Sequence, residues 1–312
     1  MFDNITLKIN DLPKNYDLCE RVKDVYRSDI NTYKGKIKNL GIYKTSNCLR
    51  IYGSLPKYLN GENITSLNRD GIRLSIKTLE KDIGLELKNA IVCSAEFGTS
   101  IITEKKPFEY LNLFGYGNRF KKIECSMRTG LETVAYTSTT GSFGFIAYDK
   151  IKEMLKKKQD IPPLFDGVNV LRLEYRIRKK RGIEAKFKNC LSAYNLFDEK
   201  VYKKFQKLFY DLYNDIDKMG RLVYVDKSKK VTPLKLLNLL AEEYRQSFPK
   251  DYRYCIQQLN EAGKLSPKSL ERIRAASRKN DRNVYISDQS ALLRELDAKI
   301  FDVMMPTELP KS

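Results

Sequence analysis

Apolar and polar residues alternate in several segments of the first half of the chain, as they do in half-buried β-strands. The clearest alternation is NVLRLEYRIRKK at 169–180, and a longer apolar segment at 89–102 reads as a strand broken at Gly98. Three further strands are predicted on the same pattern, at 2–9, 47–54 and 143–148. The alternation indicates that each of these strands buries one face and leaves the other polar.

Helical periodicity appears between these strands and dominates after about residue 195. The first helix is expected at 68–83, where Ile72, Ile76, Leu79 and Ile83 recur on one face. Pro and Gly signals mark turns at 162–167, and the pattern predicts further helices at 149–158, 203–216, 232–244, 266–280 and 288–301. We therefore predict an α+β fold: an antiparallel sheet with helices packed on one face, followed by a mainly helical C-terminal region. The boundary falls within 182–200, which divides the chain into residues 1–195 and 196–312.

The charge balance indicates a polyanionic partner. Lys and Arg number 58 against 39 for Asp and Glu, a net charge of +19 over 312 residues. Such a field favours nucleic acid, because each phosphate that is neutralised releases condensed counterions. The N-terminal residues resemble no signal peptide and no apolar run is long enough to span a membrane, so we expect a cytoplasmic protein.

The chain contains no histidine. This excludes Ser-His and Cys-His nucleophile pairs, as well as metal sites built on paired histidines. The six cysteines are spread singly and without a CxxC pair, so they are expected to be free, buried thiols and not a zinc site. Catalysis would therefore depend on Tyr, carboxylates, Lys, Arg, Ser or Cys.

The strand at 169–180 carries one carboxylate among arginines. With a period of two, Arg172, Glu174 and Arg176 face one side, while Tyr175 faces the apolar side. A cross-strand ladder of salt bridges would explain this pattern. The alternative is a glutamate that binds a metal ion or acts in catalysis on a rigid strand, flanked by guanidinium groups directed at phosphates.

Glu96 is a second candidate, since it is the only acid in the strand at 89–102. Strand parity places it with Ala90, Val92 and Ser94, and Gly98 leaves room for a close backbone approach. Two carboxylates on neighbouring strands would bind Mg²⁺ or Mn²⁺ through oxygen ligands.

Tyr148 lies where a strand gives way to a helix, with Asp149 as a potential cap and Lys150 on the first turn. Such a junction presents a side chain at the edge of the sheet. A tyrosine that attacks a phosphodiester needs nearby cations and a metal ion to manage the developing charge. The catalytic set is then Tyr148, Lys150, Arg172 and Arg176, with Glu96 and Glu174 as metal ligands.

Four segments together resemble the replication initiators of the filamentous-phage gene II/X group and, more weakly, the initiators of rolling-circle plasmids of the Rep_trans class. In order they are GSLPKYLNG (53–61), AEFG (95–98), AYDKIKE (147–153) and LRLEYRIRK (171–179). The resemblance covers roughly residues 1–215. It implies that Tyr148 attacks origin DNA and becomes linked to a 5′-phosphate, and that Glu174 and Glu96 match acidic positions of the family. Relatives often carry more than one acid in the strand that holds Glu96, so a third metal ligand is expected elsewhere: Asp149, or alternatively Glu132 or Glu153. GSLPKYLNG has no assigned chemistry and is interpreted as a turn.

The resemblance thus implies a site-specific nickase that starts rolling-circle replication in a bacterial host, with Mg²⁺ or Mn²⁺ as cofactor. Its partners would be origin DNA with a single-stranded or cruciform nick site, and host helicase and polymerase; the chain could also act as a homodimer. Basic helices near 232–280 would add duplex affinity through phosphates. The alternatives are a non-catalytic origin-binding or repressor protein, and a tyrosine recombinase or topoisomerase, which the paired glutamates disfavour.

Overall fold

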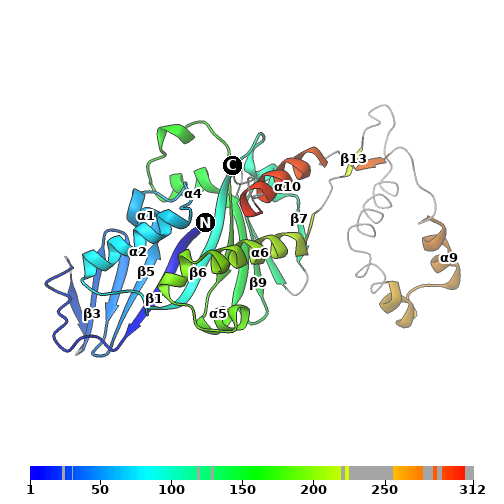
Figure 1. Cartoon of the computed structure of the whole chain (residues 1–312). Helices are drawn as coiled ribbons and strands as arrows, with labels where there is room; N and C mark the ends of the chain where they lie inside the picture. Colours follow the sequence, from blue (N-terminus) through cyan, green and yellow to red (C-terminus); the bar gives the residue numbers. More distant parts are fainter. Residues whose placement is uncertain are drawn as a thin grey trace. The chain divides into compact units, whose positions relative to one another are not determined.

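The chain forms two compact units in the computed structural model. The structure describes residues 1–22, 25–29, 31–117, 120–127, 130–218, 222–224, 256–276, 284–286 and 290–305. Unit 1 comprises Met1–Asn112, Tyr116–Ile216 and the described residues from Leu296 onward, and unit 2 comprises Leu113–Gly115 and the described part of Asp217–Glu295. Figure 1 shows both units coloured along the sequence.

Unit 1 is built on a ten-stranded sheet with the order β2-β3-β4-β5-β1-β6-β11-β10-β9-β8. Neighbouring strands in this sheet pair in antiparallel fashion, which confirms the predicted sheet type. The strands are β1 (Phe2–Asn10), β2 (Tyr26–Asp29), β3 (Thr32–Ile37), β4 (Leu40–Lys44), β5 (Cys48–Ser54), β6 (Ile91–Ile102), β8 (Phe120–Met127), β9 (Gly130–Ser138), β10 (Phe143–Asp149) and β11 (Val170–Ile177).

One face of the sheet packs against helices and forms the core (Figure 1). The helices of unit 1 are α1 (Leu55–Asn60), α2 (Arg69–Ile83), α3 (Pro107–Leu111), α4 (Lys150–Lys156), α5 (Lys180–Phe187) and α6 (Glu199–Asp215), with short 3₁₀ turns η1 (Pro163–Phe165) and η2 (Ala193–Phe197). The predicted stripe Ile72, Ile76, Leu79 and Ile83 of α2 is fully buried. In α6, the Phe205 ring contacts Phe2 and Phe97, with ring centroids 4.7 and 5.5 Å apart. The predicted α+β class is therefore confirmed.

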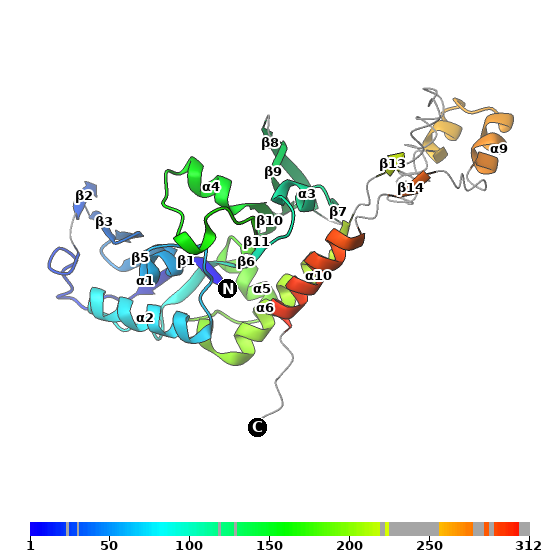
Figure 2. The ribbon, with the colours of Figure 1, turned by 90° about the horizontal axis from the view of Figure 1, so that it is seen from above.

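Helix α4 is an exception to the expected one-sided packing. It lies on the opposite side of the sheet from α2 and α6 (Figure 2). It starts directly after β10, where the Asp149 side chain accepts a hydrogen bond from the Lys152 backbone N–H at 3.0 Å and caps the helix. The chain therefore leaves β10 on the polar face of the sheet, and α4 covers that face beside Tyr148.

Strand β6 corrects two details of the sequence analysis. It continues through Gly98 without a break, because Gly98 pairs with Glu174 in the β6–β11 ladder. A β-bulge against β1 pairs Leu7 with Val92 but Thr6 with Ser94, so Val92 joins the buried face and does not share the face of Ser94 and Glu96. Parity counted along the sequence fails across a bulge, because the extra residue reverses the face of everything beyond it.

The remaining elements are mainly helical. Helix α10 (Ser290–Met304) buries Leu296, Ile300 and Met304, and α9 (Pro267–Ala276) starts where Ser266 and Pro267 predicted it. Short strands are also present: β13 (Leu222–Tyr224) pairs with β14 (Val284–Ile286), and β7 (Phe114–Gly117) with β12 (Ile216–Lys218). The predicted helix at 232–244 and the end of the one at 266–280 lie outside the described residues.

The cysteines that the structure describes are free but not buried. Of the five that the structure describes, Cys48 and Cys93 are half-buried and Cys19, Cys125 and Cys190 are exposed. The expectation of buried thiols was wrong, because these residues do not point into the apolar core. Among the described helices, none combines the length and apolarity needed to cross a membrane.

The contact at Gly98 yields a stability prediction. A Cβ atom at this position would lie 2.1 Å from the Leu173 carbonyl oxygen and 2.8 Å from Glu174 Cα. Gly98→Ala should therefore push β6 and β11 apart and lower the free energy of unfolding by about 2–4 kcal/mol, measured by urea denaturation. In Gly71→Ala of α2 the new Cβ would lie 3.1–3.4 Å from Leu67 Cδ2, Leu67 Cβ and Asn68 Oδ1 and would meet no neighbouring strand, so this control should change stability far less. Equal stability of the two variants would contradict the packing described here.

Candidate active site

Two neighbouring strands bring Tyr148 and Glu174 together on the polar face of the sheet. In the β10–β11 ladder Tyr148 pairs with Arg172, and Glu174 lies two residues further along β11 on the same face. The Tyr148 hydroxyl donates a hydrogen bond to Glu174 Oε1 at 2.8 Å. Tyr148 is 9% exposed and Glu174 1% exposed. The phenol group is therefore held by a single buried carboxylate.

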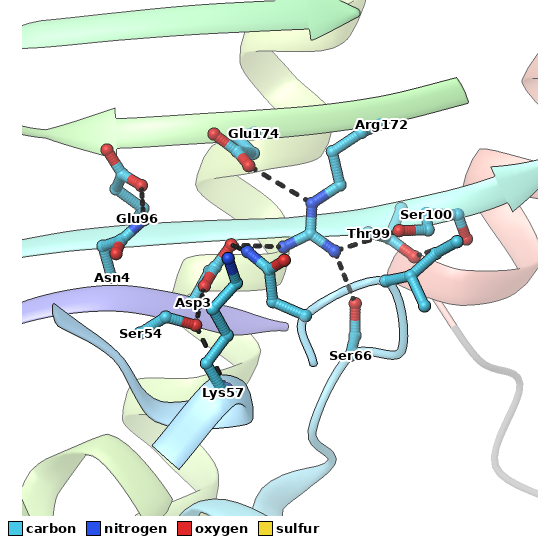
Figure 3. Close-up of polar contacts among 12 residues, drawn as sticks. Asp3, Asn4, Ser54, Lys57, Ser66, Glu96, Thr99, Ser100, Arg172 and Glu174 are labelled. Atoms are coloured by element: carbon cyan, nitrogen blue, oxygen red, sulfur yellow. Dashed lines mark hydrogen bonds and ion pairs between the residues drawn. The ribbon is translucent and has the colours of Figure 1, made fainter. Parts of the chain in front are cut away.

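Arg172 organises the interior of this site (Figure 3). Its side chain is fully buried, yet its guanidinium donates four hydrogen bonds of 3.1–3.2 Å, to Glu174 Oε1, Asp3 Oδ2, Ser66 Oγ and Ser100 Oγ. A buried guanidinium must be neutralised and hydrogen-bonded to be tolerated. Asp3 and Glu174 provide the negative charge that this requires.

Asp3 was not recognised in the sequence, although it is as deeply buried as Glu174. It accepts hydrogen bonds from Ser54 Oγ at 2.5 Å, Asn63 Nδ2 at 3.0 Å and Arg172 at 3.1 Å. Ser54 is also the N-cap of α1, accepting from the Lys57 N–H. The segment GSLPKYLNG, interpreted above as a turn, is therefore a capped helix whose N-cap residue positions Asp3.

Lys150 is fully buried below the site. Its ammonium group donates to Asn63 Oδ1 and to Glu153 Oε2, both at 2.9 Å, and lies 6.0 Å from the centre of the Tyr148 ring. Because Asn63 also bonds Asp3, a continuous chain of polar contacts runs from Lys150 through Asp3, Arg172 and Glu174 to the Tyr148 hydroxyl.

Arg176 joins Glu174 to Glu96. Its Nε is 3.1 Å from Glu174 Oε2 and 3.1 Å from Glu96 Oε1, and its Nη2 is 2.6 Å from Glu174 Oε2. Glu96 also accepts from Asn4 Nδ2 at 2.5 Å. The side chains of Arg176 and Glu96 are 25% and 22% exposed, so this end of the site reaches solvent.

These contacts set the ionisation of the site. Burial alone would raise the pKa of Glu174, but Arg172 and Arg176 outweigh it and lower that pKa to about 2. Burial raises the pKa of Glu96, and Arg176 offsets this only partly. The pKa of Tyr148 is raised well above 10 by burial and by the Glu174 charge. At neutral pH the tyrosine therefore keeps its proton and Glu174 is an anion.

The three acids considered as an additional metal ligand have other partners. Asp149 caps α4, Glu132 pairs with Lys156 and Lys152, and Glu153 pairs with Lys150 and Lys157. Burial raises the pKa of Asp149, and the Lys152 N–H acts against it.

A cavity of about 320 Å³ opens over Tyr148 and Glu174. Arg176 and three lysines of α4 and its C-terminal end, Lys152, Lys156 and Lys157, line it. Its walls also include Asp3, Asn4, Asn63, Glu132, Thr133, Ile146, Asp149 and Glu153. The lining thus combines these four cations with five acids, and each of the three lysines pairs with Glu132 or Glu153.

The site offers carboxylate oxygens, which are the kind of ligand that a hard divalent cation such as Mg²⁺ prefers. Glu96 and Glu174 are oxygen donors on adjacent strands, and the space between their carboxylates already attracts a positive group, Arg176. No cluster of three or more Asp, Glu, Cys or His suited to a metal ion occurs among the residues that the structure describes. Mg²⁺ often needs only one or two carboxylates, because water and substrate phosphate complete its octahedron.

Comparison with known families adds to this geometry. Residues 3–195 match the model of a phage family described as the N-terminal domain of a replication-associated protein. The chain belongs to this family. The match begins at Asp3 and includes Glu96, Tyr148, Arg172, Glu174 and Arg176, and the resemblance to phage replication initiators is confirmed.

A rolling-circle replication initiator protein from Geobacillus stearothermophilus is similar in structure, with 12% sequence identity and a TM-score of 0.36. The match covers 78% of this chain and 95% of that chain. Among curated proteins, none matches this chain.

The structure thus brings together Tyr148, Glu174, Arg172, Arg176 and Glu96, all named from the sequence. Lys150 and Asp149 lie next to them but are engaged in α4 and with Asn63. No sequence pattern marked the other polar residues of the site, because they are short polar residues near the ends of strands or loops. They are Asp3, Ser54, Asn63, Ser66 and Ser100. The position of Asp3 within the predicted strand at 2–9 was the one available hint.

The Asp3–Arg172 ion pair should be structurally important. Asp3→Asn keeps the size of the side chain but leaves the buried guanidinium with Glu174 as its only counter-charge, so the free energy of unfolding should fall by about 2–3 kcal/mol in urea denaturation. Asp82→Asn is the matched control, because Asp82 accepts a hydrogen bond from Tyr58 and lies outside this network. A loss in Asp3→Asn no larger than in Asp82→Asn would argue against the central place of the pair.

Proposed function

We propose that this member of the phage replication-associated family nicks replication-origin DNA with Tyr148 as nucleophile and forms a covalent 5′-phosphotyrosine intermediate. The observation that carries the proposal is the Tyr148 hydroxyl held by Glu174 at 2.8 Å, under a cavity lined by Arg176 and three lysines. A phenol, a carboxylate that can receive its proton and cations for a phosphate are the groups that such a transfer requires.

The chemistry follows from these contacts. The Tyr148 oxygen forms a bond to phosphorus, the phenolic proton passes to Glu174 Oε1, and the bond from phosphorus to the 3′ oxygen breaks, with a proton from solvent converting the departing 3′ oxygen into a free hydroxyl. The raised pKa of Tyr148 and the low pKa of Glu174 disfavour this transfer in the free protein. A phosphate among Arg176 and the lysines would compete with Glu174 for Arg176, which would make Glu174 a better base.

A divalent cation, Mg²⁺ or Mn²⁺, would be held by Glu96 and Glu174. When bound, it would polarise the scissile phosphate and stabilise its developing charge. Arg172 would keep the Glu174 carboxylate in place from the interior, and Arg176 would orient the phosphate.

In this scheme the bond to Tyr148 conserves the energy of the cleaved linkage, so the same site can rejoin the strand after one round of synthesis. Residues 1–195 would form the nicking part and residues 196–312 an accessory part that contacts duplex DNA. Host helicase and polymerase would act on the exposed 3′ end, in the cytoplasm of a bacterial host.

The nucleophile is tested by substitution. Tyr148→Phe should abolish nicking and covalent DNA attachment, since it removes the attacking oxygen, and it should leave DNA affinity within about twofold. The assay follows relaxation of a supercoiled origin plasmid and a labelled protein–DNA adduct on denaturing gels. Tyr175→Phe is the control, because Tyr175 is buried on the apolar face and should keep nicking. If Tyr148→Phe still nicks, the assignment is wrong; if the wild-type protein never nicks with Mg²⁺ or Mn²⁺, a non-catalytic origin-binding or repressor protein is the better description.

The metal assignment has its own readout. Glu96→Gln should weaken Mn²⁺ binding at least tenfold in calorimetry, because one of two carboxylate ligands loses its charge. Glu132→Gln, which removes an acid of the same cavity that is paired with lysines, should bind Mn²⁺ as the wild type does. A larger effect in Glu132→Gln would place the ion elsewhere.

A further inference from the structure

The polar face of the sheet continues beyond the active site as an exposed surface of tyrosines and cations. We call this surface the tyrosine–lysine face. It comes from strands β1 to β5 and comprises Lys8, Tyr26, Lys34, Lys36, Tyr43, Arg50 and Tyr52. None of these residues takes part in the catalytic site described above.

The strand register places five of these side chains in one row. Tyr26 pairs with Lys34, Lys34 with Tyr43, Tyr43 with Arg50, and Arg50 with Lys8. Directly paired residues of an antiparallel sheet point to the same face. The row therefore alternates aromatic and cationic groups from β2 to β5 and ends on a second cation, Lys8, in β1.

A second row runs beside the first. Lys36 pairs with Gly41, Gly41 with Tyr52, Tyr52 with Thr6, and Thr6 with Ser94. The Tyr52 ring lies over Gly41, where two ring carbons and the hydroxyl oxygen stand 2.4–2.7 Å from the place a Cβ atom would take. Gly41 thus makes room for the ring to lie against the sheet.

This face is open to solvent and its cations are not neutralised. Tyr26 and Tyr52 are 61% and 51% exposed, and Lys34, Lys36 and Arg50 are exposed as well. Within the described part of the chain, no ion pair involves Lys8, Lys34, Lys36 or Arg50. Lysines alone could serve to keep edge strands soluble. Exposed tyrosines between them do not serve that purpose, because they add apolar surface.

Polar contacts connect the face to the nucleophile. Ser94 Oγ donates to Thr6 Oγ1 at 2.8 Å at the end of the second row. Two residues further along the same strands, Asn4 donates to Glu96. Glu96 contacts Arg176, and Arg176 contacts the Glu174 carboxylate that holds Tyr148. A chain that crossed the tyrosine–lysine face would therefore arrive at the cavity over Tyr148.

We propose that the tyrosine–lysine face binds single-stranded DNA adjoining the nick site. Unpaired bases would stack on Tyr26, Tyr43 and Tyr52, and the intervening cations would neutralise the backbone phosphates. At about 4.8 Å between strands, the distance from β2 to β6 is roughly 24 Å, long enough for several nucleotides. The direction toward Tyr148 rests on the proposed nicking function; the binding of single-stranded DNA does not.

Stacking is tested with full-length protein and fluorescently labelled (dT)20, followed by anisotropy. Tyr43→Ala and Tyr52→Ala should each weaken binding about tenfold, the usual size of a lost base-stacking contact. Leu74→Ala, which removes an equally exposed large side chain from α2, should bind (dT)20 as the wild type does. Changes of less than twofold in both tyrosine variants would overturn the proposal.

The cations are tested by salt dependence. Combined Lys34→Gln, Lys36→Gln and Arg50→Gln should lower the slope of log affinity against log salt concentration by about 2, or about 0.7 for each lost phosphate contact. The control removes three other exposed lysines, Lys81, Lys88 and Lys200, with the same change in net charge. Equal slopes in the two triple variants would show that only overall charge matters and would overturn the proposal.

Two further measurements identify the ligand and its independence from nicking. Affinity for a blunt duplex hairpin should change less than affinity for (dT)20 in the tyrosine variants, because paired bases cannot stack on them; an equal loss would overturn the assignment to single strands.

The protein contains no tryptophan, so Tyr52→Trp introduces a single fluorescent reporter whose emission (dT)20 should quench. An unquenched reporter would count against stacking. All tests can be repeated with Tyr148→Phe, so failure of nicking and failure of this face are distinguishable.

Discussion

The structure of the site depends on one constraint: a fully buried guanidinium has to be neutralised. Arg172 lies in the middle of the sheet with Asp3 on one side and Glu174 on the other. Removing either acid leaves the buried guanidinium with a single counter-charge and an N–H that has lost its partner in a low-dielectric interior, which costs more than the loss of an ordinary hydrogen bond. The strands that carry these residues, β1 and β11, are separated by β6, so the ion pairs fix three neighbouring strands of the sheet.

This constraint also explains why the nucleophile is well positioned and yet unreactive in the free protein. Glu174 is held by Arg172 from below and by Arg176 from the solvent side, and it accepts the hydrogen bond from the Tyr148 hydroxyl. The arginines keep Glu174 ionised and weakly basic, while burial keeps Tyr148 protonated. Because Arg176 is the partly exposed partner, it is the group through which an incoming phosphate can change the charge balance. Arg176 thus links the ion pairs of the free protein to the basicity of Glu174 when a phosphate binds.

Much of the site was accessible from the sequence because strand periodicity is a local property. The alternation of 169–180 placed Arg172, Glu174 and Arg176 on one face, and the family resemblance singled out Tyr148 at the junction after 143–148. Local patterns could not show that Asp3 completes the charge balance, since it lies 169 residues from Arg172 along the chain. They also could not reveal the β-bulge that moves Val92 to the buried face, because a bulge is a property of the pairing between strands. The division into parts at residues 195 and 196 stays a prediction.

By itself the sequence determined the fold class, the exclusion of histidine chemistry, the family and the residue types at the centre of the site. Tertiary structure alone decided which charges meet, that GSLPKYLNG is a capped helix positioning Asp3, and that α4 covers the polar face. It also decided that the tyrosines and lysines of β2 to β5 form a single surface. The physical reason is the same in each case: periodicity assigns a residue to a face, but register and strand order, which arise from long-range pairing, decide its neighbours.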